Sequence, residues 1–217
     1  MNSRWLAFLR PLSWLYGGIT DFWHWQYDQQ QRPSVRFDLP VICIGNLTVG
    51  GTGKTPHIEY LVRLLHKRYP LAILSRGYGR KTKGFRRATA LDTARTIGDE
   101  PLQFFKKFSE TITVAVGEER ILAIPQLLQE NPSIQVILLD DGFQHRKIRP
   151  SLSLLLCDYH RPFYLDHPFP TGRLRERRHG AKRADAIIVS KCPDDLTKTE
   201  QQTIQDHLQP YLKNPSI

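Results

Sequence analysis

A glycine-rich run that ends in a lysine and a threonine is the part of the chain best suited to phosphate chemistry. The run "TVGGTGKT" spans Thr48 to Thr55. Glycines let the backbone fold closely enough for its N–H groups to point at phosphate oxygens. In the pattern G-x-x-x-x-G-K-[ST], the lysine reaches the β- and γ-phosphates and the hydroxyl binds Mg²⁺. Thr48 replaces the first glycine here, and Gly50-Gly51 would supply the flexibility.

A second run places two acids at the end of an apolar stretch. "VILLDDGFQH" covers residues 136–145. An apolar strand that ends in a carboxylate is the Walker B arrangement, in which the acid emerges beside the phosphate loop. We expect Asp140 or Asp141 to hold Mg²⁺, directly or through water. Gln144 and His145 could orient a phosphate or the nucleophile, although a lone histidine is more often structural.

The run "IGDEP" (97–101) brings two acids to an expected helix start. One interpretation makes Asp99 or Glu100 a general base for a hydroxyl nucleophile. The other makes the acids an N-cap, with Pro101 in the first helical turn. The two interpretations are compatible.

The run "PTGRLRERR" (170–178) gathers four arginines around Glu176. An arginine beside a transferred phosphoryl group would stabilise its developing negative charge. The run by itself does not choose among Arg173, Arg175, Arg177 and Arg178.

Strand-like and helix-like stretches alternate along the chain, which indicates a doubly wound α/β fold with a mostly parallel sheet flanked by helices. Two basic loops, 75–87 and 171–183, interrupt the alternation. Thr197 and Glu200 form a capping-box pattern at the start of the last helix. We expect strands at 39–45, 71–77, 111–117, 134–141, 151–158 and 184–191, and helices at 54–68, 98–108, 118–130 and 197–212.

The N-terminal stretch is apolar and aromatic. It holds all four tryptophans, Trp5, Trp14, Trp23 and Trp25. Arg10 and Pro11 interrupt its apolar run, which is unlike a signal peptide and too short to span a bilayer. Two interpretations stay open: an amphipathic aromatic helix that lies on a membrane surface, or a helix packed on the protein's own core.

The composition is that of one globular domain with a basic surface. The formal charge is +10 from 31 basic and 21 acidic residues, which suits an anionic partner. Nucleic acid is disfavoured because the aromatic residues do not interleave with the basic loops. Cys43, Cys157 and Cys192 are widely spaced, so we expect buried apolar residues in a reduced compartment, not a disulfide or a zinc site.

Taken together, these runs resemble the lipid A tetraacyldisaccharide 4′-kinases. The matching stretches are "IGNLTVGGTGKTP", "LSRGYGR", "GDEP", "DDGFQH", "PTGRLRE" and "ADAIIVSK". The resemblance implies a P-loop NTPase-like fold that transfers the γ-phosphoryl group of ATP, with Mg²⁺, to the 4′-hydroxyl of a tetraacyldisaccharide 1-phosphate. It also implies peripheral attachment to the anionic cytoplasmic face of the inner membrane of a Gram-negative bacterium. The implied partners are the lipid A precursor and that membrane, with no nucleic acid.

The resemblance also implies roles for individual residues. Asp99 would be the base, with Lys54 and Arg175 also catalytic. Mg²⁺ would be held by Thr55, Asp140, Asp141 and Glu176. The nucleotide would be bound by Thr48, Val49, Gly50, Gly51, Thr52, Gly53, Lys54 and Thr55. Substrate would be bound by Arg76, Tyr78, Arg80, Gln144 and His145.

The same resemblance divides the chain into three segments. Residues 1–30 would associate with the membrane, 31–192 would form the kinase domain, and 193–217 would begin a C-terminal lobe. Family members continue this lobe, and we expect the present chain to lack most of it. The alternatives are another P-loop kinase or a catalytically incomplete, nucleotide-dependent binding module. A GTPase is disfavoured because no N-K-x-D-like run is found.

Overall fold

The computed structural model describes residues 3–213, with side chains from Phe8 onward. The chain forms two compact units that alternate along the sequence. Unit 1 comprises Met1–Pro33, Gly45–Gly53 and Ser153–Ile217, and unit 2 comprises Ser34–Ile44 and Lys54–Leu152. The two units are described separately below.

Unit 2 is built on a sheet with the strand order β3-β4-β2-β5-β1. The pairs β1–β5, β2–β5 and β2–β4 are parallel, and only β3 runs antiparallel to its neighbour β4. The parallel strands are almost completely buried, as expected when helices cover both faces of a sheet. The strands are β1 (Val41–Asn46, whose last two residues belong to unit 1), β2 (Leu71–Ser75), β3 (Arg86–Arg87), β4 (Thr113–Val116) and β5 (Val136–Asp140).

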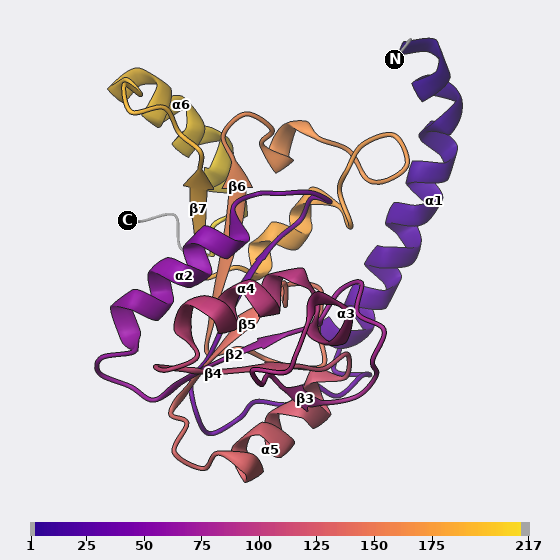
Figure 1. The fold of residues 1–217 in the computed structure, drawn as a ribbon. Helices are drawn as coiled ribbons and strands as arrows, with labels where there is room; N and C mark the ends of the chain where they lie inside the picture. Colours follow the sequence, from indigo (N-terminus) through magenta and orange to yellow (C-terminus); the bar gives the residue numbers. More distant parts are fainter. Residues whose placement is uncertain (1–2, 214–217) are drawn as a thin grey trace. The chain divides into compact units, whose positions relative to one another are not determined.

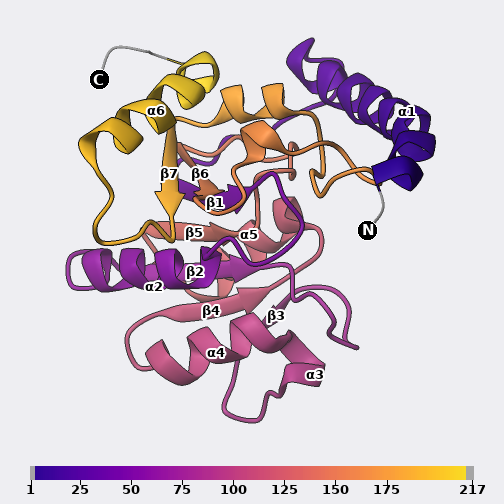
Figure 2. The ribbon, with the colours of Figure 1, turned by 90° about the horizontal axis from the view of Figure 1, so that it is seen from above.

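Helices pack on both faces of this sheet. Figures 1 and 2 show α2 and α4 on one side of β2, β4 and β5, and Figure 1 shows α5 on the other. Ile124 and Leu127 of α5 form one buried cluster with Ile137 of β5, among others. Pro125 lies inside α5. The helices are α2 (Lys54–Leu65), α3 (Ala94–Ile97), α4 (Asp99–Phe108) and α5 (Arg120–Glu130).

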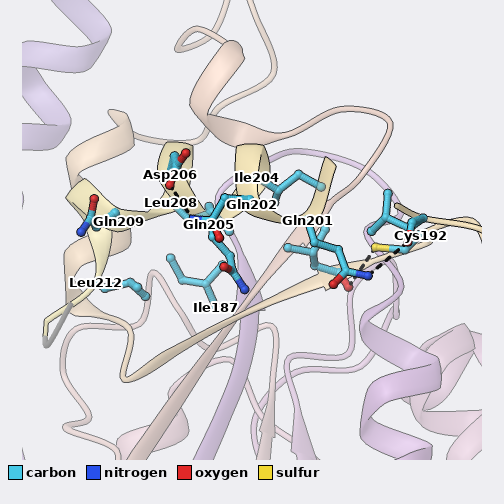
Figure 3. Close-up of a pocket in the computed structure, with 12 residues that line it drawn as sticks. Ile187, Cys192, Gln201, Gln202, Ile204, Gln205, Asp206, Leu208, Gln209 and Leu212 are labelled. Carbon is cyan, nitrogen blue, oxygen red and sulfur yellow. Dashed lines mark hydrogen bonds between the residues drawn. The ribbon is translucent and has the colours of Figure 1, made fainter. Parts of the chain in front are cut away.

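Unit 1 contains the parallel strands β6 (Leu152–Asp158) and β7 (Ala186–Ser190). The helix α6 (Lys198–Leu208) begins with the predicted capping box, in which Thr197 and Glu200 bond reciprocally. Apolar and polar side chains of α6, β7 and the residues after them line a groove of about 490 Å³ (Figure 3). The described residues of the unit also form the short 3₁₀ helices η1 (Phe163–Leu165), η2 (Arg178–Arg183) and η3 (Gln209–Tyr211).

The helix α1 (Ser3–Asp28) belongs to unit 1 and has two different faces. On one face Ser13 donates a hydrogen bond to the carbonyl of Pro168, and Tyr16 donates one to the carbonyl of Arg175. The opposite face exposes a stripe at helical spacing, here called the apolar stripe: Phe8, Leu12, Leu15, Ile19 and Phe22. No helix in the described part of the chain is long and apolar enough to cross a membrane. The hydrogen-bonded face agrees with a helix packed on its own protein unit, and the interpretation as a membrane-surface helix stays a prediction for the exposed face.

The predicted elements are confirmed, with ends shifted by a few residues. The mostly parallel sheet flanked by helices is also confirmed. The expectation of three buried cysteines is wrong for Cys192, which is exposed, whereas Cys43 and Cys157 are buried and none of the three forms a disulfide. Cys192 follows the end of β7 and lines the groove beside α6, so it lies outside the packed strands. The three-segment division at residues 30 and 192 stays a prediction.

Candidate active site

The end of β5 carries a buried acid in unit 2. Asp140 is 3% exposed and accepts a hydrogen bond of 2.9 Å from the hydroxyl of Ser75. Ser75 ends β2, which is the parallel neighbour of β5, so both side chains lie at the carboxyl edge of the sheet. Burial, followed by the negative charge of Glu100, raises the pKa of Asp140 to about 6. The site is thus rich in negative charge and would favour a bound cation.

The side chain of Lys54 also lies at the end of β5. Its Nζ lies 3.7 Å from Oδ1 of Asp141, so the first residue of α2 reaches the residue that follows β5. Asp141 has a φ of 49°, a left-handed conformation that is uncommon outside glycine and often marks functional turns. The lysine of the glycine-rich run and the acidic pair, which the sequence placed about 85 residues apart, are therefore neighbours in unit 2.

A buried arginine that sequence reasoning missed supports this turn. Arg120 is the first residue of α5, and its guanidinium donates to the main-chain carbonyls of Asp140 and Asp141, at 3.3 Å each. Burial lowers the pKa of Arg120, although the two nearby aspartates act in the opposite direction. The only sequence signal was an arginine followed directly by five apolar residues, 121–125.

Asp99 and Glu100 occupy the first turn of α4. The N-cap residue is Gly98, so the expectation that an acid is the N-cap is wrong. Acids in a first turn are favoured by the partial positive charge of the helix N-terminus. Both side chains are exposed, and Glu100 is close enough to Asp140 to raise its pKa. The choice of Asp99 as the base stays a prediction.

The glycine-rich loop from Thr48 to Gly53 belongs to unit 1, whereas Lys54 and Thr55 open α2 in unit 2. Gly50 and Gly53 have φ values of 123° and 83°, which only glycine adopts without strain. The amide of Asn46 donates to the hydroxyl of Thr52 at 2.7 Å. A pocket of about 220 Å³ opens beside the loop, and its lining includes Asp158, Arg161, Arg173 and Lys191. Positive charge in this lining suits a phosphate group.

The arginine-rich run lies against the loop within unit 1. The N–H of Val49 donates to the carbonyl of Arg173, and the N–H of Arg175 donates to the carbonyl of Leu47, each at 2.8 Å. These contacts act through the main chain, so the roles of the arginine side chains, including the proposed catalytic role of Arg175, stay predictions.

Glu176 is the one acid of this run and is 1% exposed. The guanidinium of Arg183 binds both carboxylate oxygens of Glu176, at 2.7 and 2.8 Å. His24 Nε2 of α1 lies 3.1 Å from Oε2 of the same carboxylate. Burial alone would raise the pKa of Glu176, but the hydrogen bonds from His24 and Arg183 outweigh it and lower the pKa to about 2. In this structure Glu176 ties the arginine-rich run to α1. Its predicted role as a metal ligand would require some of these bonds to be exchanged.

The predicted substrate residues differ in their surroundings within unit 2. The Arg80 guanidinium is buried and binds Glu118 at 2.7 Å and the carbonyl of Gly84 at 2.5 Å, so it holds its own loop together. Arg76 and Tyr78 are exposed, Tyr78 to 88%. Burial lowers the pKa of His145 to about 4, and its buried Nε2 has no hydrogen-bond partner among the described residues. A neutral imidazole can offer one donor and one acceptor to a ligand.

The candidate residues are thus divided between the two units. Unit 1 holds residues 48–53 with Arg175 and Glu176, and unit 2 holds the others. Within unit 2 the structure brings together Lys54, Asp140 and Asp141, with Glu100 nearby.

A glycine loop between a buried strand and a helix, with an acid at the end of a parallel strand, defines the P-loop class of nucleotide-binding α/β proteins. Comparison with known families narrows this class. The profile of the Tetraacyldisaccharide-1-P 4′-kinase family matches residues 5–215. The chain belongs to this family.

Individual relatives agree with the family assignment. A protein of Bacteroides thetaiotaomicron named "Tetraacyldisaccharide 4′-kinase" is 50% identical over 204 residues, which cover 94% of this chain and 53% of the relative. One of the same name from Porphyromonas gingivalis is 48% identical over 205 residues, covering 94% of this chain and 57% of the relative. The chain therefore spans about half the length of the curated relatives it matches.

A solved structure shares the fold. The crystal structure of an "apo" form of LpxK from Aquifex aeolicus in complex with ATP matches with a TM-score of 0.79 and 37% sequence identity. The match covers 86% of this chain and 59% of that one.

Proposed function

We propose that this chain carries the phosphotransfer machinery of an ATP-dependent kinase that phosphorylates the 4′-hydroxyl of a tetraacyldisaccharide 1-phosphate in lipid A biosynthesis. The names of the relatives and the ATP in the related crystal structure support this reaction. The observation that carries the proposal is the approach of Lys54 Nζ to Asp141 at the carboxyl edge of the sheet. It places a phosphate-binding lysine beside the acids that such kinases use for their metal.

The residues at the end of β5 fit Mg²⁺. Hard oxygen ligands are available from Asp140, Asp141 and the hydroxyl of Thr55, and a cation would favour the ionised form of Asp140. No group of three or more histidine, cysteine or acidic residues that could hold a metal occurs in the described part of the chain. Mg²⁺ suits such a site because it is usually bound by one or two carboxylates together with water and substrate phosphates. When bound, the ion neutralises charge on the phosphates.

Several other candidate residues have a role in the proposed reaction. The loop 48–53 cradles the phosphates with its N–H groups, and Lys54 binds the phosphate oxygens. Asp99 accepts the proton of the sugar hydroxyl, and Arg175 stabilises charge on the transferred group. The exposed side chains Arg76 and Tyr78 meet the anionic headgroup of the substrate.

The apolar stripe of α1 provides the membrane contact. An exposed row of aromatic and aliphatic side chains on a helix that does not span the bilayer is typical of interfacial binding. We assign this contact to the anionic cytoplasmic face of the inner membrane, where the lipid substrate would also lie. Residues 1–30 then form the membrane-associating segment and 31–192 the kinase domain.

The test is transfer of labelled phosphate from ATP to tetraacyldisaccharide 1-phosphate in detergent micelles. We expect Lys54→Ala to abolish transfer, and Asp99→Ala to reduce it by about 10²-fold or more, the range typical of general-base removal, while ATP still binds. Lys67→Ala, at an exposed lysine beyond the end of α2, is the matched control and should transfer normally.

Three results would count against the proposal or part of it. Normal transfer by Lys54→Ala would refute the assignment of the phosphate loop. Loss of ATP binding by Asp99→Ala would give Asp99 a structural role. ATP binding by the unaltered chain without any transfer would identify a nucleotide-binding module instead of a kinase.

A further inference from the structure

The end of β7 contacts the glycine-rich loop through two neighbouring side chains. We propose that Lys191 and Ser190, supported by Asp158, are positioning residues that hold the carbonyl groups of the phosphate loop. This inference deepens the proposed function and rests on it in one respect, namely that the loop 48–53 binds phosphate.

A phosphate loop has a specific hydrogen-bonding requirement. Every residue in it carries an N–H donor and a C=O acceptor. The N–H groups can point at an anion only if the carbonyls point elsewhere, because a carbonyl oxygen facing a phosphate repels it. Carbonyls turned outward need donors of their own, since an unpaired polar group near the protein interior is costly.

Lys191 and Ser190 supply such donors on consecutive residues of unit 1. The Nζ of Lys191 donates to the carbonyl of Gly51 at 2.5 Å. The hydroxyl of Ser190, which is buried, donates to the carbonyl of Thr52 at 2.9 Å. Two successive carbonyls of the loop are therefore held by the end of one strand.

Asp158 fixes the lysine from the neighbouring strand. Its Oδ2 accepts from Lys191 Nζ at 2.5 Å, and its Oδ1 accepts from the N–H of His160 at 2.9 Å. Asp158 and Ser190 are paired in the register of β6 and β7, so the acid and both donors stand on hydrogen-bonded strand ends. Strand ends hold side chains more firmly than loops do.

The backbone at Lys191 supports a positioning role. Its φ is 60°, a left-handed conformation that costs energy for a residue with a side chain. Such strain persists where the surrounding contacts impose it and is concentrated at functional sites. Lys191 and Asp158 also line the pocket beside the loop. Both Lys191 and Lys54 contact an acid, but Lys191 also donates a hydrogen bond to a main-chain carbonyl of the loop.

The experiment measures Mg·ATP binding by titration calorimetry on the unaltered chain and on three variants. Because the Lys191 side chain is 44% exposed, solvent screens its contacts, and we expect Lys191→Met to weaken binding by about two- to tenfold. We expect Ser190→Ala, which removes a buried hydroxyl, to weaken it by about three- to tenfold. Lys213→Met is the matched control. Lys213 pairs with Asp185 at 2.6 Å, just before the other end of β7, and its removal should leave binding unchanged.

A chemical rescue separates positioning from a general effect on folding. Lys191→Ala should regain part of its ATP affinity when ethylammonium is added, because the free cation can occupy the place between Asp158 and Gly51. Its melting temperature should change little over the same addition. Lys213→Ala should not respond to ethylammonium.

The outcomes distinguish this inference from the proposed function. If the unaltered chain binds Mg·ATP and Lys191→Met binds it equally well, the positioning role is wrong while the proposed function stands. If the unaltered chain does not bind Mg·ATP, both are wrong. If Lys191→Met fails to fold, judged by circular dichroism, Ser190→Ala decides: undiminished affinity in this variant overturns the inference.

Discussion

Asp140 is an acid held where its charged form is disfavoured. Its folded pKa of about 6 lies above the ordinary value of 3.8 for an aspartate, so the native state binds more protons than the unfolded state between these values. Stability therefore falls as pH rises from about 4 to about 6 and stays lower above that range. This cost is typical of a functional site, where stability is exchanged for activity.

We predict that Asp140→Asn raises stability at pH 7.5 in the absence of Mg²⁺, by roughly 1–3 kcal/mol, because the neutral amide avoids the buried charge and still accepts from Ser75. The same variant should lose Mg²⁺-dependent ATP binding. Thermal unfolding in EDTA measures the first effect, and the gain should vanish near pH 4. A loss of stability at pH 7.5 would contradict a raised pKa.

The pKa of Glu176 is shifted in the opposite direction to that of Asp140. Its folded pKa of about 2 lies below the ordinary value of 4.5 for a glutamate, so its ionised form stabilises the fold above about pH 4.5. That contribution is lost as pH falls from about 4.5 toward 2. Because Arg183 and His24 bind the carboxylate in a buried place, removing its charge leaves the arginine without compensation.

We predict that Glu176→Gln destabilises the protein by about 3–5 kcal/mol at pH 7, the usual cost of breaking a buried ion pair. Urea unfolding followed by tryptophan fluorescence is the measurement, because all four tryptophans lie within the first 25 residues. Glu110→Gln, at an exposed acid, is the control. An effect no larger than that of the control would show that the buried pair contributes nothing.

At the scale of elements, α1 combines two tasks on opposite faces. One face holds the arginine-rich run through Tyr16 and His24, and the other exposes the apolar stripe. The internal contacts on one face hold the helix in place, and the apolar side chains on the other face are available to a binding partner. A long exposed apolar surface on a protein usually marks an interaction site.

We predict that the double variant Leu15→Glu/Ile19→Glu reduces binding to anionic phospholipid vesicles by at least about tenfold, since two apolar side chains would no longer be buried in the lipid. Co-sedimentation with vesicles measures the effect. Leu64→Glu, at an exposed leucine of α2, is the matched control. Equal binding by the double variant and the control would remove the apolar stripe as the membrane contact.

At the scale of the whole molecule, the net charge of +10 acts over a longer range than any single contact. It attracts the protein to anionic surfaces, and this attraction is screened by salt. Apolar burial by α1 is not screened in the same way. The two contributions to the proposed membrane binding can therefore be separated by ionic strength.

We predict that vesicle binding falls severalfold when salt is raised from about 0.1 M to about 1 M, where the Debye length shrinks from about 10 Å to about 3 Å, but does not disappear. Vesicles of neutral lipid should show the weaker, salt-insensitive part alone. Binding that is abolished by salt would leave the apolar stripe without a role. If binding to anionic vesicles does not change with salt, the basic surface has no role in membrane binding.

Local patterns in the sequence determined the elements and the outline of the site. The buried strands are visible in the sequence as apolar runs, and α2 is visible as apolar residues that recur with the helical period of 3.6. The glycine loop and the acidic pair are short motifs that can be recognised without knowledge of distant residues. For the same reason the capping box of α6 could be predicted residue by residue.

The tertiary structure alone decided what each charged residue does. The sequence could not tell that Arg80, Arg120 and Arg183 are held by internal partners, or that Glu176 is buried by α1. It also gave no sign that Lys191 contacts the loop carbonyl of Gly51, 140 positions earlier. Burial, pKa and hydrogen-bond partners depend on which distant segments meet, and no local pattern carries that information.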